Sequence, residues 1–424
     1  LTVATPFTLE LRAAVARLWS SDIKTEERAL ASKEFRELTK VCQEMVAQTP
    51  YEVKGDFDAS QLRWEIRNLF RTIGAPWFDG IAPNTETATG ALVGAYAEDR
   101  HCVTQLVPLD IADDLPPCAF GSFKVRQFSS AEFSQVIQLA RLSRFGPLCT
   151  PDLTKLSQFT WLMHTSDQSR HVPSRSATFL DGILLDEVGR VRHKKRRFDP
   201  GLELGMFVLI LPPWEDATVH DFWTWQPFKM PWVYKLSSDP LRDPPRAPDP
   251  TSLTWEFRID PNTEEEYEVP MQNTLEPKID LHLDELPQLW TKAEAVLGRA
   301  RASNGCFNPL IEHYFLRAFE DEDLDQLLWH VATIDAAIGD GDKKRLVKRV
   351  QRLVQDMKLT DIFADLYDLR SEYIHGRPID DSNLWQKNLR DARRVARQVV
   401  VGVLDLAYAN PAWNRKVLLK ELAK

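Results

Sequence analysis

Residues 361–376 read DIFADLYDLRSEYIHG, and this stretch decides how the C-terminal third of the chain is interpreted. Apolar residues recur at intervals of three and four, which is typical of an amphipathic helix. We expect Thr360 to cap the helix and Gly376 to end it in a left-handed conformation. Arg370 falls within the buried stripe, so its charge needs a partner or a function. The predicted stripe consists of Phe363, Leu366, Tyr367, Arg370 and Ile374.

Helical periodicity extends outward from this stretch, from Leu286 to the C-terminus. Asn308 and Pro309 form a cap and first-turn pair for one helix, and Gly339 and Gly341 end the next one. Short connections between the helices favour an antiparallel bundle. The helices are expected at residues 283–300, 309–319, 323–338, 343–357, 361–375 and 383–408.

The helix predicted at residues 343–357 is strongly basic. Its expected inward residues are Leu346, Val350, Leu353 and Met357, and its expected outward residues are Lys344, Lys348, Arg349 and Arg352. From Asp342 onward the chain has 18 Lys and Arg against 11 Asp and Glu, although its formal net charge is −9. The net charge argues against a protein that coats nucleic acid nonspecifically, but a basic C-terminal region can bind phosphate locally.

The remainder of the chain has a different periodicity. Residues 1–50 read as helices, as in ELRAAVARLW. Between Ala91 and Ile259 we expect strands at CVTQLVPL, FGSFKVRQF, SQFTWLMHT, MFVLILPPW and LTWEFRI, interrupted by a helix at SAEFSQVIQLARL. The proline-rich segment Ser237–Pro250 can continue neither a helix nor a central strand, so it predicts a long loop or a linker.

These patterns predict an α+β protein in which a mixed body of helices and strands precedes an all-α bundle. At 424 residues the chain is long enough for two or three domains. We expect N-terminal helices over residues 1–50, an α+β sensor or specificity domain over 51–275, and the helical bundle over 280–424.

Composition excludes several classes of protein. The chain is 43% hydrophobic and 27% charged, which is ordinary for a globular protein. It has no run of 18 apolar residues, so we expect a cytoplasmic protein without a membrane-spanning segment. No cysteine pair has zinc or redox spacing, and His164, His171 and His220 lack a suitably spaced third ligand. We therefore expect no metal and no cofactor. The scattered cysteines are Cys42, Cys102, Cys118, Cys149 and Cys306.

Arg370 and His375 can be read in two ways from their spacing alone. Five residues along an ideal helix place them about 140° apart, so they converge only if the last turn is distorted or a second subunit faces them. In a purely structural role, both cations would complement the negative end of the helix dipole. Asp335, Asp368 or Glu372 would then neutralise Arg370.

The C-terminal region resembles the Apea-like branch of the HEPN superfamily. The resemblance covers roughly residues 284–408: an apolar helix with an acidic residue before a Gly, a second amphipathic helix, then LYDLRS followed by His and Gly. The hallmark of the family is an Arg, usually followed by a polar residue, with a His four to six residues further on near a helix end. The matching positions in this sequence are Arg370, Ser371 and His375.

The resemblance implies a metal-independent endoribonuclease that acts as a homodimer with a composite active site. His375 would serve as general base or acid, because an imidazole has an ordinary pKa of about 6.5. Arg370 would hold the scissile phosphate. By resemblance the protein would be a bacterial antiphage defence or toxin effector, restrained until a trigger, such as a phage-derived one, releases it. The alternative is a non-catalytic module that binds nucleotide or RNA, or that only dimerises.

Two basic clusters are candidate RNA-binding segments. Arg393, Arg394 and Arg397 lie on the last predicted helix, and Lys194, Lys195, Arg196 and Arg197 lie in RVRHKKRRF between two predicted strands. The second cluster can equally be a solvated loop. The aromatic segment Phe222–Tyr234 offers stacking faces for bases, but packing in a core is the expected role of so many aromatic residues.

Overall fold

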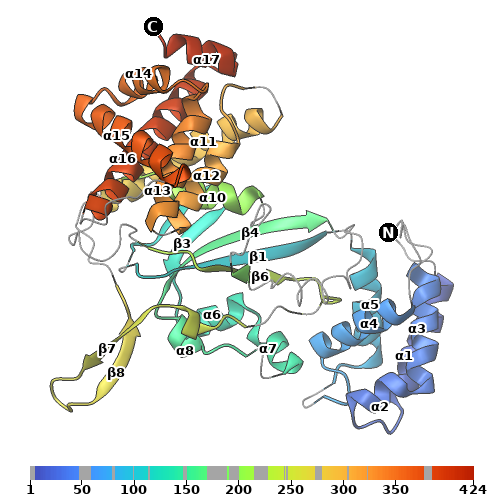
Figure 1. Cartoon of the computed structure of the whole chain (residues 1–424). Helices are drawn as coiled ribbons and strands as arrows, with labels where there is room; N and C mark the ends of the chain where they lie inside the picture. The colour runs from blue at the N-terminus through green and yellow to red at the C-terminus, as the bar shows by residue number, and fades with distance from the viewer. Residues whose placement is uncertain are drawn as a thin grey trace.

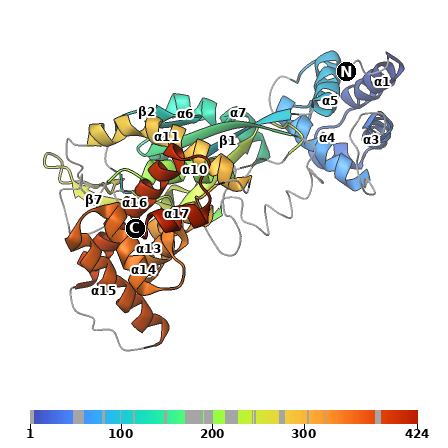
Figure 2. The ribbon, with the colours of Figure 1, turned by 90° about the horizontal axis from the view of Figure 1, so that it is seen from above.

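A computed structural model shows three regions: helices at the N-terminus, a central antiparallel sheet, and a helical bundle at the C-terminus (Figures 1 and 2). The structure describes residues 5–46, 59–78, 82–98, 100–112, 115–146, 150–169, 189–190, 200–213, 228–242, 244, 247–272, 279–302, 305–321, 323–376 and 384–424. The chain is therefore an α+β protein, as the sequence predicts.

The N-terminal region is a small helical body with its own hydrophobic core. Its helices are α1 (Thr5–Trp19), α2 (Glu26–Ala31), α3 (Lys33–Val46), α4 (Ala59–Ile73) and α5 (Thr85–Ala97). One buried cluster includes Leu11, Phe35, Phe70 and Leu92. Helices α4 and α5 thus share a core with α1 and α3, so helical structure continues well beyond residue 50.

The central sheet has the strand order β2-β3-β4-β1-β6-β5, and the neighbouring strands are antiparallel. Its strands are β1 (Arg100–Leu109), β2 (Cys118–Phe120), β3 (Phe123–Gln127), β4 (Thr160–Ser169), β5 (Gly189–Arg190) and β6 (Trp232–Ser237). A separate hairpin consists of β7 (Trp255–Ile259) and β8 (Glu266–Pro270). Four of the five predicted strand runs are confirmed.

Helices cover both faces of the sheet. On one face lie α6 (Ser130–Val136), α7 (Leu139–Leu142) and α8 (Leu153–Leu156), next to the short 3-10 turn η1 (Ser143–Phe145) (Figure 1). Their core includes Phe133, Trp161 and Trp232. The predicted helix at SAEFSQVIQLARL is divided between α6 and α7 because Gln138 adopts a left-handed conformation with φ of 55°. A second 3-10 turn, η4 (Pro250–Ser252), precedes β7.

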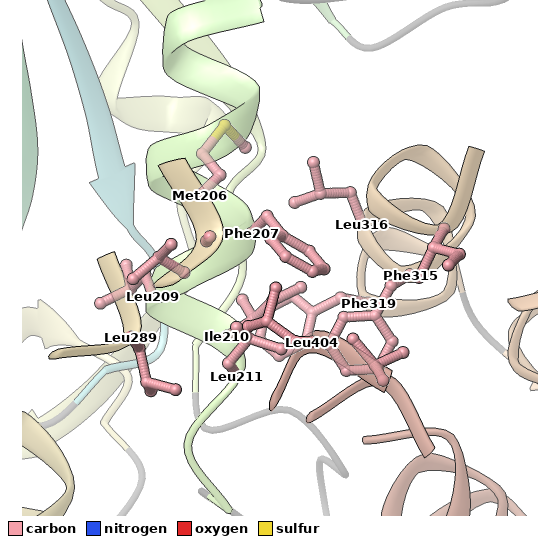
Figure 3. Packing of buried hydrophobic residues seen from close by; sticks show 14 of the residues in the cluster. Met206, Phe207, Leu209, Ile210, Leu211, Leu289, Phe315, Leu316, Phe319 and Leu404 are labelled. Atoms are coloured by element: carbon pink, nitrogen blue, oxygen red, sulfur yellow. The ribbon is translucent and has the colours of Figure 1, made fainter. Parts of the chain in front are cut away.

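The predicted strand MFVLILPPW is wrong: residues 200–210 form helix α10 (Pro200–Ile210). Met206, Phe207 and Ile210 are fully buried between the sheet and the bundle, beside Phe315 and the other side chains drawn in Figure 3. A helix that is buried on all sides has no polar face, so its sequence reads as a continuous apolar run and not as an amphipathic period.

The C-terminal bundle shares this core with the sheet through α10. Its helices are α11 (Ile279–Arg301), α12 (Leu310–Glu320), α13 (Asp323–Ile338), α14 (Lys343–Val354), α15 (Met357–Ile374), α16 (Leu384–Ala409) and α17 (Arg415–Glu421). Helix α16 contacts α11, α13, α14 and α15, so it lies at the centre of the bundle. The helical character predicted from Leu286 onward is confirmed, whereas α17 was not predicted.

Two caps of the bundle follow the sequence prediction and one does not. Asn308 Oδ1 accepts from the backbone N–H of Leu310 at 3.1 Å, as expected of a cap. Gly376 has a φ of +66°, the left-handed conformation predicted for it. Helix α15, however, begins at Met357, because the side chain of Asp356 and not Thr360 caps it. Met357 is exposed, so its predicted burial is also wrong.

No helix in the described ranges is both long enough and apolar enough to cross a lipid bilayer.

Candidate functional site

The C-terminal end of α15 carries Arg370, Ser371 and His375. Arg370 is half-buried, and its guanidinium carbon lies 5.8 Å from the centroid of the Tyr367 ring. Within the described part of the chain Arg370 makes no ion pair, and Asp368, one of its expected partners, bonds Lys343 instead. The guanidinium therefore keeps its hydrogen-bond donors available for an anionic ligand.

His375 is exposed at the position that follows the last residue of α15. Its backbone N–H donates to the carbonyl oxygen of Ser371 at 3.1 Å, so the chain is still helical there. Gly376 then donates to Tyr373 at 3.0 Å and ends the helix. The spacing of five residues places Arg370 and His375 about 140° apart around α15, on different sides of the helix. A facing pair would have to come from a second copy of the chain.

The end of α15 exposes apolar side chains as well as His375. Tyr373 is 39% exposed and Ile374 is 53% exposed. Ile374 was predicted to be buried and this prediction is wrong, whereas Phe363 and Leu366 of the same stripe are buried as predicted. Exposed apolar residues beside an exposed histidine are typical of a surface that another protein surface covers.

The solvent-facing side of α15 is acidic. Four carboxylates are exposed along it, and Lys343 engages one of them. The residues are Asp361, Asp365, Asp368 and Glu372. Because these carboxylates repel anions, we expect a negatively charged substrate to approach Arg370 from a different side of α15.

Arg393 and Arg397, two of the predicted RNA-binding residues, are buried in the bundle. Their exposed fractions are 1% and 4%, whereas Arg394 between them is exposed. Burial lowers the pKa of both guanidinium groups to about 9. Only Arg394 remains a candidate for contact with RNA. The prediction for the other two is corrected, because α16 is surrounded by helices and has little surface for its cations.

Arg393 packs against apolar and aromatic groups. Its guanidinium carbon lies 5.3 Å from the centroid of the Phe319 ring, and none of its nitrogens has a hydrogen-bond partner among the described residues. His330 of α13 is also buried, and burial together with the charge of Arg393 lowers its pKa well below the ordinary value. Together they form a costly polar cluster in the interior.

The second predicted basic cluster, comprising Lys194, Lys195, Arg196 and Arg197, lies outside the described residues. In the aromatic segment 222–234, the described residues Phe228, Trp232 and Tyr234 are buried in the core. Their expected role in packing is confirmed.

The described residues offer few sites for metal-dependent or cysteine-dependent chemistry. No group of three or more His, Cys, Asp and Glu side chains there is arranged to hold a metal ion. Cys42, Cys102, Cys118 and Cys306 are free thiols, and burial raises the pKa of Cys118 to about 11. A groove of about 480 Å³ beside the β7–β8 hairpin is lined by side chains such as Gln127, Ser129 and Arg258, far along the chain from α15.

Sequence reasoning missed one surface of the bundle. Lys416 and Lys420 of α17 are exposed, and the residue Ala423 that follows this helix accepts a hydrogen bond from Lys348 of α14. The short helix α17 was not predicted, although Asn414 caps it by accepting from Val417 at 3.0 Å. A cap residue followed by RKVLLKE is the signal from which this helix could have been found.

Comparison with known proteins gives no relative: no family model matches the chain, and no characterised protein or solved structure is significantly similar to it.

Proposed function

We propose that the chain is a metal-independent endoribonuclease of the HEPN type, in which Arg370, Ser371 and His375 act on the scissile phosphate. The observation that carries the proposal is the end of α15. There, Arg370 is half-buried without an ion-pair partner among the described residues, and His375 is exposed at the last turn. A purely structural arginine would be expected to bond a neighbouring carboxylate, and Asp368 bonds Lys343 instead.

The reaction would begin with attack of the ribose 2′-oxygen on the adjacent phosphorus. His375 would accept the proton of the 2′-hydroxyl as the new P–O bond forms, and Arg370 would stabilise the charge that develops on the phosphoryl oxygens. The bond to the 5′-oxygen then breaks, and a second imidazole gives that oxygen a proton. The products are a 2′,3′-cyclic phosphate and a 5′-hydroxyl.

A homodimer would supply the second imidazole. Because Arg370 and His375 lie on different sides of α15, one chain cannot direct both groups at one phosphate without rearrangement. The exposed Tyr373 and Ile374 give the end of α15 an apolar surface that a second copy would cover. In the cell such an enzyme would act as a toxin or antiphage effector, restrained by the N-terminal region until a trigger releases it.

The test is cleavage of a mixed tRNA and mRNA pool in EDTA by the wild-type chain, His375→Ala and Arg370→Lys. Glu372→Gln is the matched control, because it changes an exposed side chain on the same turn. We expect both site variants to lose cleavage at unchanged melting temperature and the control to retain it. Cleavage that survives in His375→Ala would contradict the proposed role.

The second candidate is a non-catalytic dimerisation module. It is favoured by the acidic side of α15, which repels phosphate, and by the exposed apolar residues at its end. For such a module Tyr373→Ser and Ile374→Ser would abolish the dimer, and no RNA would be cleaved by any form of the chain, including the isolated bundle.

A further inference from the structure

The solvent-facing side of α14 carries a row of cations. Lys344, Lys348 and Arg352 are exposed and follow one another at intervals of four residues. Because an α-helix rises about 1.5 Å per residue, these side chains lie on one side with a spacing of about 6 Å. Helix α14 contains no Asp or Glu between Lys343 and Val354. Like charges four residues apart slightly destabilise a helix, so helix stability does not explain the row.

Helix α17, which ends against α14, adds two exposed cations, Lys416 and Lys420. The ammonium of Lys348 donates to the carbonyl oxygen of Ala423 at 2.8 Å, which fixes the end of α17 against α14. Figure 1 shows the two helices at the end of the bundle that lies away from the sheet. We define the basic face as Lys344, Lys348, Arg352, Lys416 and Lys420.

The charge of the basic face is largely uncompensated. In the part of the chain that the structure describes, the basic-face residues form no ion pair with a carboxylate. The nearby carboxylates are engaged by other cations, in the pairs Asp340 with Arg349, Asp342 with Arg345, and Glu421 with Lys424. A protein with a net charge of −9 thus presents a concentrated positive surface on its bundle.

The basic face begins close to the proposed catalytic residues. Lys343, the residue before Lys344, forms an ion pair with Asp368 of α15. Asp368 lies two residues before Arg370 on the same helix. Asp368 belongs to the acidic side of α15, and a separation of two residues places Arg370 on roughly the opposite side of that helix, so a polyanion that leaves the N-terminus of α14 must pass around α15 to reach Arg370.

We propose that the basic face binds the phosphodiester backbone of single-stranded RNA and leads the strand toward Arg370 and His375. The choice of RNA among polyanions rests on the proposed function. Cations that neutralise phosphates release counterions, which gives binding energy that depends strongly on salt concentration. Lysine and arginine contacts to phosphate position a strand but do not read its bases, so binding through this face is tolerant of sequence.

The test measures binding apart from cleavage. A fluorescently labelled single-stranded oligoribonucleotide is titrated with the full chain carrying His375→Ala, and fluorescence anisotropy is recorded over a series of salt concentrations. The test variant adds Lys344→Gln, Lys348→Gln and Arg352→Gln. A second variant changes Lys416→Gln and Lys420→Gln on α17. The matched control changes Lys24→Gln, Arg28→Gln and Lys40→Gln, three exposed cations of the N-terminal region.

We expect the α14 variant to bind RNA about 10- to 100-fold more weakly at near-physiological salt. The slope of log K against log salt should fall by up to about 2, since each lost phosphate contact on a single strand is worth about 0.7. The α17 variant should show a smaller loss of the same kind, and the control should bind like the parent.

Three results would overturn the inference: unchanged affinity in the α14 variant, an equal loss in the control, or binding of poly-glutamate in preference to RNA, which would indicate an acidic protein partner. Failure of the proposed function appears separately. If the chain binds RNA through the basic face but does not cleave it, the inferred binding is supported and the proposed nuclease activity is contradicted.

Discussion

Helices α14 and α16 have similar basic sequences, KKRLVKRVQRLV and LRDARRVARQVV, but the structure uses their cations in opposite ways. Lys344, Lys348 and Arg352 of α14 face solvent, whereas Arg393 and Arg397 of α16 are buried. The difference follows from position in the bundle, because α16 contacts four other helices. A basic pattern therefore indicates a binding surface only where the helix has an open side.

The largest expected effect compares one buried arginine on each helix. Arg393 of α16 has no hydrogen-bond partner among the described residues, whereas Arg349 of α14 donates to the carbonyl oxygen of Ile338 at 2.8 Å and to Asp340 at 2.7 Å. Arg393→Met should leave stability unchanged or raise it by about 1–4 kcal/mol, because it removes a buried charge. Arg349→Met should lower it by about 1–3 kcal/mol, because it leaves buried acceptors unpaired.

Urea denaturation of the two variants measures this difference directly. Destabilisation by Arg393→Met as large as that by Arg349→Met would mean that the guanidinium of Arg393 has a binding partner that offsets its burial. The buried cations of α16 would then resemble Arg349 of α14, whose charge is stabilised by bonded acceptors.

The next effect concerns the pH dependence of stability near α16. Burial and the charge of Arg393 hold the pKa of His330 well below 6.5, so the folded chain keeps this imidazole neutral. Below about pH 6.5 the unfolded chain takes up a proton that the folded chain cannot, and stability falls as pH falls. The slope for one such group approaches about 1.4 kcal/mol per pH unit.

Thermal and urea unfolding between pH 7 and pH 5 should show that His330→Met removes this component. His375→Ala, which changes an exposed imidazole, is the control and should keep the full pH dependence. If the free energy of unfolding has the same pH dependence in His330→Met and in the parent, then His330 takes up a proton in the folded chain as readily as in the unfolded chain.

The sequence predicted the bundle well because its helices are amphipathic. The period of three and four places Leu346 and Val350 inside α14 and Lys344 and Lys348 outside, and the structure agrees. Arg349 was predicted outside but is 4% exposed, because a turn at Asp340 supplies acceptors that the helical period cannot reveal. Local patterns predict which side of a helix is apolar, but not which loop faces it.

The errors occur where burial removes the pattern. Helix α10 is apolar except for Glu203, and its run MFVLI was read as a strand, whereas the arginines of α16 were read as surface residues because cations usually are. At the candidate site, the sequence predicted the ending at Gly376 but not the exposure of Ile374, which depends on where neighbouring helices stop. In these three places burial depends on which other elements pack against the residue, and the local sequence pattern does not show those contacts.

The smallest expected effect on stability comes from a substitution on α14 that should weaken RNA binding with little change in the free energy of unfolding. Lys348→Glu replaces two repulsive i,i+4 contacts, with Lys344 and Arg352, by two attractive ones worth about 0.2–0.5 kcal/mol each. It also removes the hydrogen bond from Lys348 to Ala423. We therefore expect the free energy of unfolding to change by no more than about 0.5 kcal/mol while RNA affinity falls clearly, with Lys40→Glu on α3 as the control for charge. If Lys348→Glu instead cost more than about 1 kcal/mol, the contact between α14 and α17 would be the reason for this lysine, and the basic side of α14 would be structural in the way that α16 is.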